Sequence, residues 1–160
     1  MGEIIVREAG PADRPTVVSL LTGSWGTTVV VAHEVRYDAA ALPALLAWCD
    51  GGPVGLLTYT IGPDGLEVVT IDAVVPHAGI GTVLLAAAAE KAWAAGAERL
   101  WLVTTNDNLD ALRFYQRRGL RLVAVHSGAV DRARALKPAI PLVGAHGIEI
   151  HDELVLELTR

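Results

Sequence analysis

The chain has 160 residues, 52% of them hydrophobic, and its 13 basic and 18 acidic residues give a formal net charge of −5. This length suits one domain around one core, so we expect residues 1–160 to form a single domain without a linker. The negative charge is opposite to that of most duplex-binding proteins, which argues against nucleic acid as a partner. No apolar run approaches the ~18 residues of a membrane helix, so no membrane association is expected.

The cysteine content and the N-terminal residues both bear on the cellular compartment of the protein. Cys49 is the single cysteine, which excludes an internal disulfide and fits a reducing environment. Charged residues at Glu3, Arg7 and Glu8 surround only three apolar residues, unlike a secretory signal peptide. We therefore expect a cytoplasmic protein.

The first half of the chain is dominated by strand patterns around one helix. Alternation around Ile4 and Val6 predicts a strand at residues 3–8, and Asp13 is a candidate N-cap for the helix that follows. That helix is expected to break at the Trp25-Gly26 pair. After it we expect an extended run at 27–31, a helical turn at 38–42, and strands at 44–49, 54–61 and 66–75.

The second half begins with an alanine-rich helix that stops at Gly96. The apolar run at 100–104 is typical of a parallel strand covered on both faces, which makes strand, helix and strand one right-handed crossover. Further expected elements are a helix at 109–118, strands at 120–126 and 153–158, and between these strands an irregular insertion at 127–152. Charged and apolar residues alternate in the last strand, which predicts that it is half exposed.

A glycine-rich turn joins the strand at 66–75 to the alanine-rich helix. Backbone amides in the first turn of a helix attract phosphate, and glycine lets a ligand approach the backbone closely. The candidate ligands are the backbone groups of Gly79, Ile80, Gly81 and Thr82. By spacing alone, an ordinary strand-to-helix turn fits equally well. A Walker A loop is disfavoured because its Lys-Ser/Thr pair is missing, and a Rossmann loop because Leu84 replaces its third small residue.

Three pieces of the chain form one recognisable order. The first is V-V-P-H-A-G-I-G-T at residues 74–82. The second is N-x-x-A-x-x-x-Y, carried by Asn108, Ala111 and Tyr115 and followed by R-R-G-L at 117–120. The third is the order of the strands around them. Together they resemble the GNAT superfamily of acyl-CoA N-acetyltransferases over most of the chain.

The resemblance implies an α/β (α+β) fold with a mixed, mostly antiparallel sheet of about six to seven strands. A parallel strand-helix-strand crossover lies at its centre, and helices cover both faces. In that fold the strands at 66–75 and 100–104 splay apart and leave unpaired backbone groups for the pantetheine arm of a cofactor.

The resemblance also implies acetyl-CoA as co-substrate, and no metal. In such a site the amides from Ala78 to Thr82 hold the pyrophosphate, and the backbone of Val74 binds the pantetheine arm. Asn108 contacts the same arm, although an N-cap explains this residue equally well. The family usually has Gln or Arg three residues before the first glycine, where this chain has Pro76. One phosphate contact of the family is therefore expected to be missing.

Tyr115 is the expected general acid. Attack of an amine on a thioester expels a thiolate whose conjugate acid has a pKa of about 8.5, and a nearby phenol can donate a proton to it. The competing interpretation of Tyr115 is a core aromatic residue at helical spacing from Leu112.

The base is expected on the strand before the glycine turn. An alkylammonium with a pKa of about 10.4 is mostly protonated at neutral pH and must lose a proton before it attacks. Glu67 is the first choice, because the family often places a carboxylate early in this strand, and Asp72 is the alternative. Five residues apart, they lie on opposite faces unless a bulge intervenes. A structural role is the competing interpretation for each.

The predicted function is transfer of acetyl from acetyl-CoA to a primary amine, by direct attack in a ternary complex. The alternative is a non-catalytic acyl-CoA-binding module of the same fold. The acceptor is a small-molecule or peptide amine that the sequence does not specify. Trp25 and Arg36 either line the acceptor side or serve core packing and surface charge. A homodimer through the exposed edge of the last strand is compatible with both functions.

Overall fold

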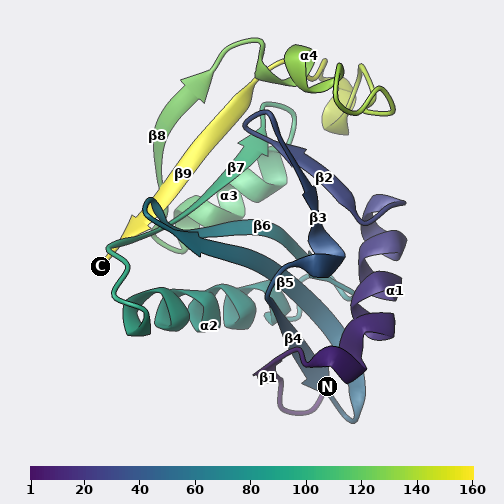
Figure 1. Cartoon of the computed structure of the whole chain (residues 1–160), viewed down its shortest axis with the longest axis vertical. Coiled ribbons are helices and arrows are strands. Elements are labelled where there is room, and N and C mark those ends of the chain that lie inside the picture. Colours follow the sequence, from purple (N-terminus) through teal and green to yellow (C-terminus); the bar gives the residue numbers. More distant parts are fainter. The chain divides into compact units, whose positions relative to one another are not determined.

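The computed structural model describes residues 1–160, which form two compact units (Figure 1). Unit 1 comprises residues 1–30, 38–100 and 160, and unit 2 comprises residues 31–37 and 101–159. None of the helices combines the length and the apolar character needed to span a bilayer. The single domain predicted above, and the splay of strands that belong to different units, stay predictions.

The elements follow the predicted order closely. In chain order they are β1 (Ile5–Glu8), η1 (Pro11–Asp13), α1 (Arg14–Trp25), β2 (Val29–Ala32), β3 (Val35–Asp38), η2 (Ala39–Ala41), β4 (Ala44–Cys49), β5 (Gly52–Gly62), β6 (Gly65–Ala73), α2 (Ile80–Ala94), β7 (Arg99–Thr105), α3 (Leu109–Arg117), β8 (Arg121–His126), α4 (Ala129–Ala133), η3 (Ala145–Gly147) and β9 (Glu153–Thr159). The mixed α/β class is confirmed, because each predicted strand and helix has a counterpart. The strand β3 was not predicted.

Unit 1 is built on four strands in the order β1-β4-β5-β6, each antiparallel to its neighbour. The helices α1 and α2 cover its two faces (Figure 1). On the α1 face, Val17 and Leu21 of the helix share a buried cluster with Leu46 and Leu56 of the sheet. On the α2 face, a Cβ at Gly55 would lie 2.5 Å from Ile80 Cγ2, so the absent side chain lets α2 pack closely.

A bulge interrupts the pairing of β5 with β6. Thr58 pairs with Thr70, but the next residue of β5, Tyr59, pairs with Val68. Val69 is therefore an extra residue of β6, opposed by no residue of its own on β5. A bulge of one residue reverses which face the side chains on either side of it point to, relative to a regular strand.

The N-terminus of α1 differs from the prediction that Asp13 caps it. Asp13 makes no side-chain capping bond to α1. It instead accepts hydrogen bonds from Arg7 at 2.8 and 2.9 Å and from the Gly10 amide at 2.8 Å. The Arg7 hydrogen bond lowers the pKa of Asp13 to about 2. The predicted end of the helix is confirmed, since α1 stops at Trp25 and Gly26 takes a left-handed conformation with φ of 73°.

Unit 2 contains three strands in the order β7-β9-β8, with β8 antiparallel to β9. The last strand, β9, thus lies between two neighbours and offers no edge. The prediction that a homodimer uses the edge of the last strand is therefore wrong in its choice of strand. The outer position belongs to β8, which exposes Leu122, Val123 and Val125.

The unpredicted hairpin β2-β3 belongs mostly to unit 2. Its turn is formed by His33 and Glu34, with φ of 39° and 64°. Left-handed turns usually carry Gly or Asn, so this turn had no recognisable signal in the sequence. The His33 amide donates to both carboxylate oxygens of Glu153 on β9, each at 3.1 Å.

At one residue, this contact departs from the pattern expected of a half-exposed last strand. Glu153 is only 3% exposed. Burial raises its pKa, against the opposing effect of the His33 amide. Its position in the alternating pattern is the polar face of β9, but the hairpin covers that face.

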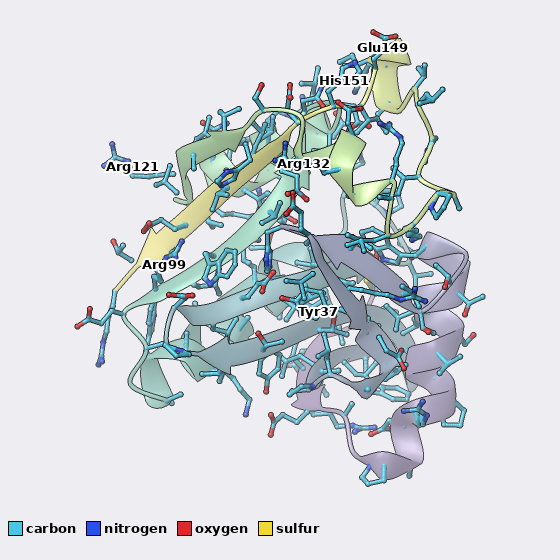
Figure 2. All side chains as sticks on the ribbon, turned by 45° about the horizontal axis from the view of Figure 1, so that its top comes forward. Tyr37, Arg99, Arg121, Arg132, Glu149 and His151 are labelled. Carbon is cyan, nitrogen blue, oxygen red and sulfur yellow. The ribbon has the colours of Figure 1, made fainter.

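The insertion at 127–152 contains one short helix, α4. Arg134, which follows this helix, donates to the carbonyl of Ile150 at 2.8 Å and forms an ion pair with Asp131 at 2.7 Å. His151 lies beside Glu149 (Figure 2) and also contacts Asp131, with Nδ1 3.1 Å from Oδ1. The Asp131 hydrogen bond raises the pKa of His151.

Candidate active site

The glycine turn opens α2 as the sequence predicted. Gly79 is the N-cap residue, with φ of 81° and open space where a Cβ would stand. The Val83 amide donates to the Gly79 carbonyl at 3.1 Å and makes the first bond of the helix. The amides of Ile80 and Gly81 precede that bond and, by helix geometry, have no acceptor within the helix. Thr82 is exposed on the same turn, and Ala78 is half-buried just before it. Phosphate binding by these residues stays a prediction.

Packing against the sheet fixes the position of this first turn. Ile80 is 1% exposed and Leu84 is fully buried. A Cβ on Gly55 of β5 would come within 3.0 Å of Leu84 Cδ1 as well as of Ile80. The position of the N-terminal amides of α2 therefore depends on Gly55 of β5.

Part of the backbone of Val74 is already hydrogen-bonded within the sheet. Its amide donates to the Val54 carbonyl at 2.8 Å. In an antiparallel ladder, successive residues turn their backbone groups to opposite edges of the strand. Ala73 therefore directs its amide and carbonyl groups away from β5, whereas the Val74 amide points toward it. Binding of the pantetheine arm by Val74 stays a prediction.

The bulge brings the two candidate bases to the same face of β6. Glu67 pairs with Thr60, and Asp72 pairs with Leu56. Because Thr60 and Leu56 are four residues apart on β5, their side chains and those of their partners share one face, the α1 face. The same spacing separates Glu67 from Asp72 by about 13 Å along the strand. The two carboxylates can thus face one ligand but cannot both bind one atom of it.

Asp72 is held only by neutral donors. Trp25 Nε1 at the end of α1 donates to Asp72 Oδ2 at 2.8 Å, and the Ser24 side chain also donates to it. Burial raises the pKa of Asp72, against the opposing effect of these two hydrogen bonds. Trp25 is 42% exposed, so core packing does not account for it.

Glu67 lies deeper on the same face. Its side chain is 3% exposed. Between Glu67 and Asp72, the hydroxyls of Thr58 and Thr70 share a buried hydrogen bond of 2.6 Å. A carboxylate at each end and two hydroxyls in the middle thus make a polar strip on an otherwise apolar face. The roles of Glu67 and Asp72 as bases stay predictions.

In unit 2, α3 carries the other two predicted site residues. Asn108 is the N-cap, because its Oδ1 accepts from the Ala111 amide at 3.3 Å. Its Nδ2 donates to Thr104 Oγ1, also at 3.3 Å. Tyr115 is 7% exposed, and its ring stands edge-on to Phe114 at 5.4 Å. The capping role of Asn108 is confirmed, and contact of either side chain with a cofactor stays a prediction.

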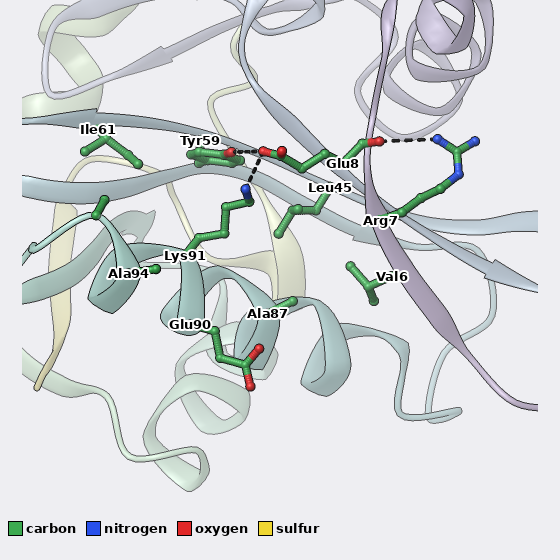
Figure 3. A pocket seen from close by; sticks show the side chains of 11 residues that line it. Val6, Arg7, Glu8, Leu45, Tyr59, Ile61, Ala87, Glu90, Lys91 and Ala94 are labelled. Atoms are coloured by element: carbon green, nitrogen blue, oxygen red, sulfur yellow. Dashed lines mark hydrogen bonds and ion pairs between the residues drawn. The ribbon is translucent and has the colours of Figure 1, made fainter.

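A groove of about 580 Å³ lies on the α2 face of unit 1, bounded by β1, β4, β5 and the second half of α2. Glu8 is at its centre, accepting from the Tyr59 hydroxyl at 2.8 Å and pairing with Lys91 at 2.7 Å (Figure 3). Lys91 lowers the pKa of Glu8, whereas burial and then Glu8 raise that of Tyr59. These residues are too far apart in sequence for any motif to have joined them.

A sheet whose strand β6 leads through a glycine turn into α2 agrees with the arrangement that the resemblance to an acyltransferase family implied. Residues 17–120 match the Acetyltransferase (GNAT) family. The chain is 40% identical to the uncharacterized protein YdhI of Bacillus subtilis over 132 residues, 82% of each chain. It therefore belongs to the GNAT acetyltransferase family.

Solved structures share the fold. One is described as an IAA acetyltransferase from Bacillus cereus; it has a TM-score of 0.78 and 20% identity, over 99% of this chain and 100% of that one. Another is a GNAT family acetyltransferase from Elizabethkingia anophelis with acetyl-CoA bound, with a TM-score of 0.68 and 19% identity over 98% of each chain. At these identities the likeness establishes the fold alone, and it agrees with the fold class expected from the sequence.

Proposed function

We propose that this acetyltransferase moves the acetyl group of acetyl-CoA to a primary amine by direct attack in a ternary complex in the cytoplasm. The observation that carries the proposal is the left-handed Gly79 at the start of α2, which sets the amides of Ile80 and Gly81 ahead of the first helical hydrogen bond. Amides in this position, with the helix dipole behind them, bind anions such as a diphosphate.

The cofactor is proposed to lie along β6. Its diphosphate binds the backbone from Ala78 to Thr82, and its pantetheine arm runs back along the strand edge. The backbone groups of Ala73 face that edge and bind the arm, together with the part of the Val74 backbone that its hydrogen bond to Val54 leaves available. Asn108 contributes its side-chain amide to the same arm. This course brings the thioester toward the bulge at Val69.

The chemistry balances with two protein groups. The amine nitrogen attacks the thioester carbonyl, a C–N bond forms and the C–S bond breaks. Glu67, directly or through water, takes the proton that the amine must lose, and the Tyr115 phenol gives a proton to the departing thiolate. Glu67 lies two residues from the bulge, which favours it over Asp72 as the base. General acid or base groups of this kind contribute about 10²- to 10⁴-fold to the rate.

The function is tested by measuring thiol release from acetyl-CoA with a panel of aliphatic amines, amino acids, aminoglycosides and peptides. The proposal expects saturable, amine-dependent release by at least one class, with the acetylated amine detected by mass spectrometry. Release no faster than hydrolysis with every class would contradict the choice of an amine as acceptor.

The residue roles are tested with Tyr115→Phe and Glu67→Gln. Each is expected to lower kcat by about 10²- to 10⁴-fold while the CoA dissociation constant is unchanged. Tyr59→Phe and Glu8→Gln are matched controls, because they make the same chemical changes in the groove on the α2 face. Equal losses in a catalytic variant and its control would refute the assigned role.

A further inference from the structure

Asp72 differs from the ion-paired carboxylates of the chain in what compensates its charge. Several acidic side chains have a basic partner: Glu8 with Lys91, Asp13 with Arg7, Asp131 with Arg134, and Glu34 with Arg132. Asp72 has only the neutral donors Trp25 and Ser24. An ionised carboxylate taken partly out of water without a counter-ion is costly. A positively charged ligand would supply the missing compensation.

Trp25 adds a second feature suited to a cation. Its indole nitrogen is bound to Asp72, which holds the ring beside the carboxylate, and yet the side chain stays 42% exposed. The face of an indole ring attracts ammonium and quaternary ammonium groups within about 6 Å of the ring centre. A carboxylate and an exposed indole held together thus present charge and a π face to the same ligand.

We propose that Trp25 and Asp72 bind a cationic group of the acceptor other than the nitrogen that becomes acetylated. The acceptor is then a diamine, or another amine that carries a second positive charge. This inference rests on the proposed amine acetyltransferase function and names the acceptor class within it.

The reason for a second charge lies in the requirements of the reaction. The nitrogen that attacks must lose a proton, and Glu67 is the group proposed to take it. A nitrogen held beside an ionised Asp72 instead keeps its charge, because a nearby carboxylate favours the protonated form. Glu67, about 13 Å from Asp72 along β6, sits beside the bulge where the reaction is proposed to occur. Asp72 is therefore suited to a group that keeps its charge, while the reacting nitrogen lies closer to Glu67.

The kinetic test compares putrescine, cadaverine and spermidine with n-butylamine and n-pentylamine. The wild-type protein is expected to prefer the polyamines in kcat/KM by about 10- to 100-fold, the range of a hydrogen bond to a charged group. Asp72→Asn should abolish this preference, because it raises KM for the polyamines much more than for the monoamines. Asp64→Asn, which alters an exposed carboxylate in the β5-β6 turn, is the matched control. Equal losses for diamines and monoamines in Asp72→Asn would overturn the proposal.

Binding of tetramethylammonium tests the same site without catalysis. Titration calorimetry should detect binding to the wild type and to Asp64→Asn. Asp72→Asn should lose about fivefold or more in affinity, because the charge attraction to the cation is removed, and Trp25→Phe, which keeps a ring, should lose less. Circular dichroism confirms that each variant is folded. If this pattern holds but no amine releases thiol, the proposed function fails and the cation site stands. If amines are acetylated but Asp72→Asn binds the probe as tightly as wild type, the cation site fails alone.

Discussion

Two carboxylates on opposite faces of the sheet in unit 1 differ in their partners and in the direction of their pKa shifts. On the α2 face, Glu8 is paired with Lys91 and accepts from Tyr59, and its pKa is lowered chiefly by the Lys91 hydrogen bond. On the α1 face, Asp72 accepts from Trp25 and Ser24 only, and burial raises its pKa. The first carboxylate is compensated within the fold, and the second is not.

The difference separates a structural arrangement from one that is ready for a ligand. A carboxylate whose pKa is lowered by folding stabilises the folded state at neutral pH, and one whose pKa is raised costs stability there. Functional sites often carry such a cost. We therefore expect substitutions on the α2 face to lower stability and cofactor binding. Neutralising Asp72 should lower acceptor binding and raise the free energy of unfolding.

The largest effect on stability is expected on the α2 face from Gly55→Ala. The added Cβ would stand 2.5 Å from Ile80 Cγ2 and 3.0 Å from the Asp72 carbonyl. Overpacking of this kind costs about 1–3 kcal/mol. Denaturant unfolding should show this loss, and titration should show weaker CoA binding because the first turn of α2 shifts. Gly62→Ala, where nothing lies within 4 Å, is the control. An unchanged CoA affinity would refute the claim that packing of Gly55 against Ile80 positions the glycine turn.

The next largest effect is expected from Gly79→Ala. Its φ of 81° requires the left-handed conformation, which costs about 1–2 kcal/mol for a residue with a Cβ. Because nothing lies within 4 Å of that Cβ, the penalty is one of backbone conformation and not of collision. Thermal unfolding and CoA titration should both report losses. Gly23→Ala, inside α1 with open space around it, should instead be neutral or stabilising, and equal losses in both variants would refute the argument.

Glu8→Gln is expected to lower the free energy of unfolding by about 0.2–1 kcal/mol, the range of exposed ion pairs. Acetyl transfer should not change. Asp72→Asn should lower transfer to diamines without any loss of stability, since the amide oxygen can still accept from Trp25. Urea unfolding and kcat/KM measured on both variants give the comparison directly. A stability loss in Asp72→Asn as large as that in Glu8→Gln would remove the distinction between the two faces.

The smallest effect is a difference in pH dependence. Because the folded-state pKa of Glu8 is lowered, its contribution is present above the unfolded pKa of about 4.3 and is lost as pH falls through the folded pKa. The folded-state pKa of Asp72 is raised, so its cost is present at neutral pH and disappears as pH falls below about 3.9. Unfolding from pH 7 into the acid range should show the deficit of Glu8→Gln and the gain of Asp72→Asn both shrinking. Gaps that widen with acid would contradict these signs.

Local patterns in the sequence were enough for most of the fold. The apolar run at 44–49, bounded by turn residues, is β4 as observed. The left-handed Gly79, the end of α1 at Gly26 and the N-cap at Asn108 were all recognisable because each depends on residues close in sequence. A feature that depends only on residues within one turn or one helix cap can be predicted from the local sequence.

Features that depend on distant partners could not be predicted. The bulge at Val69 is defined by pairing with β5, and it alone decides that Glu67 and Asp72 share a face. Trp25 and Asp72 are 47 residues apart and make no motif. Glu153 has the pattern of an exposed charge and is buried by a hairpin about 120 residues away. In each case the sequence contains the residue, and the tertiary structure supplies its neighbour.

The most direct test is a crystal structure of the protein with CoA and tetramethylammonium. We expect the diphosphate on the amides of Ile80, Gly81 and Thr82, and the cation against the Asp72 carboxylate and the Trp25 ring. A diphosphate bound elsewhere, or a cation beside Glu8 in the groove on the α2 face, would contradict the proposed binding sites.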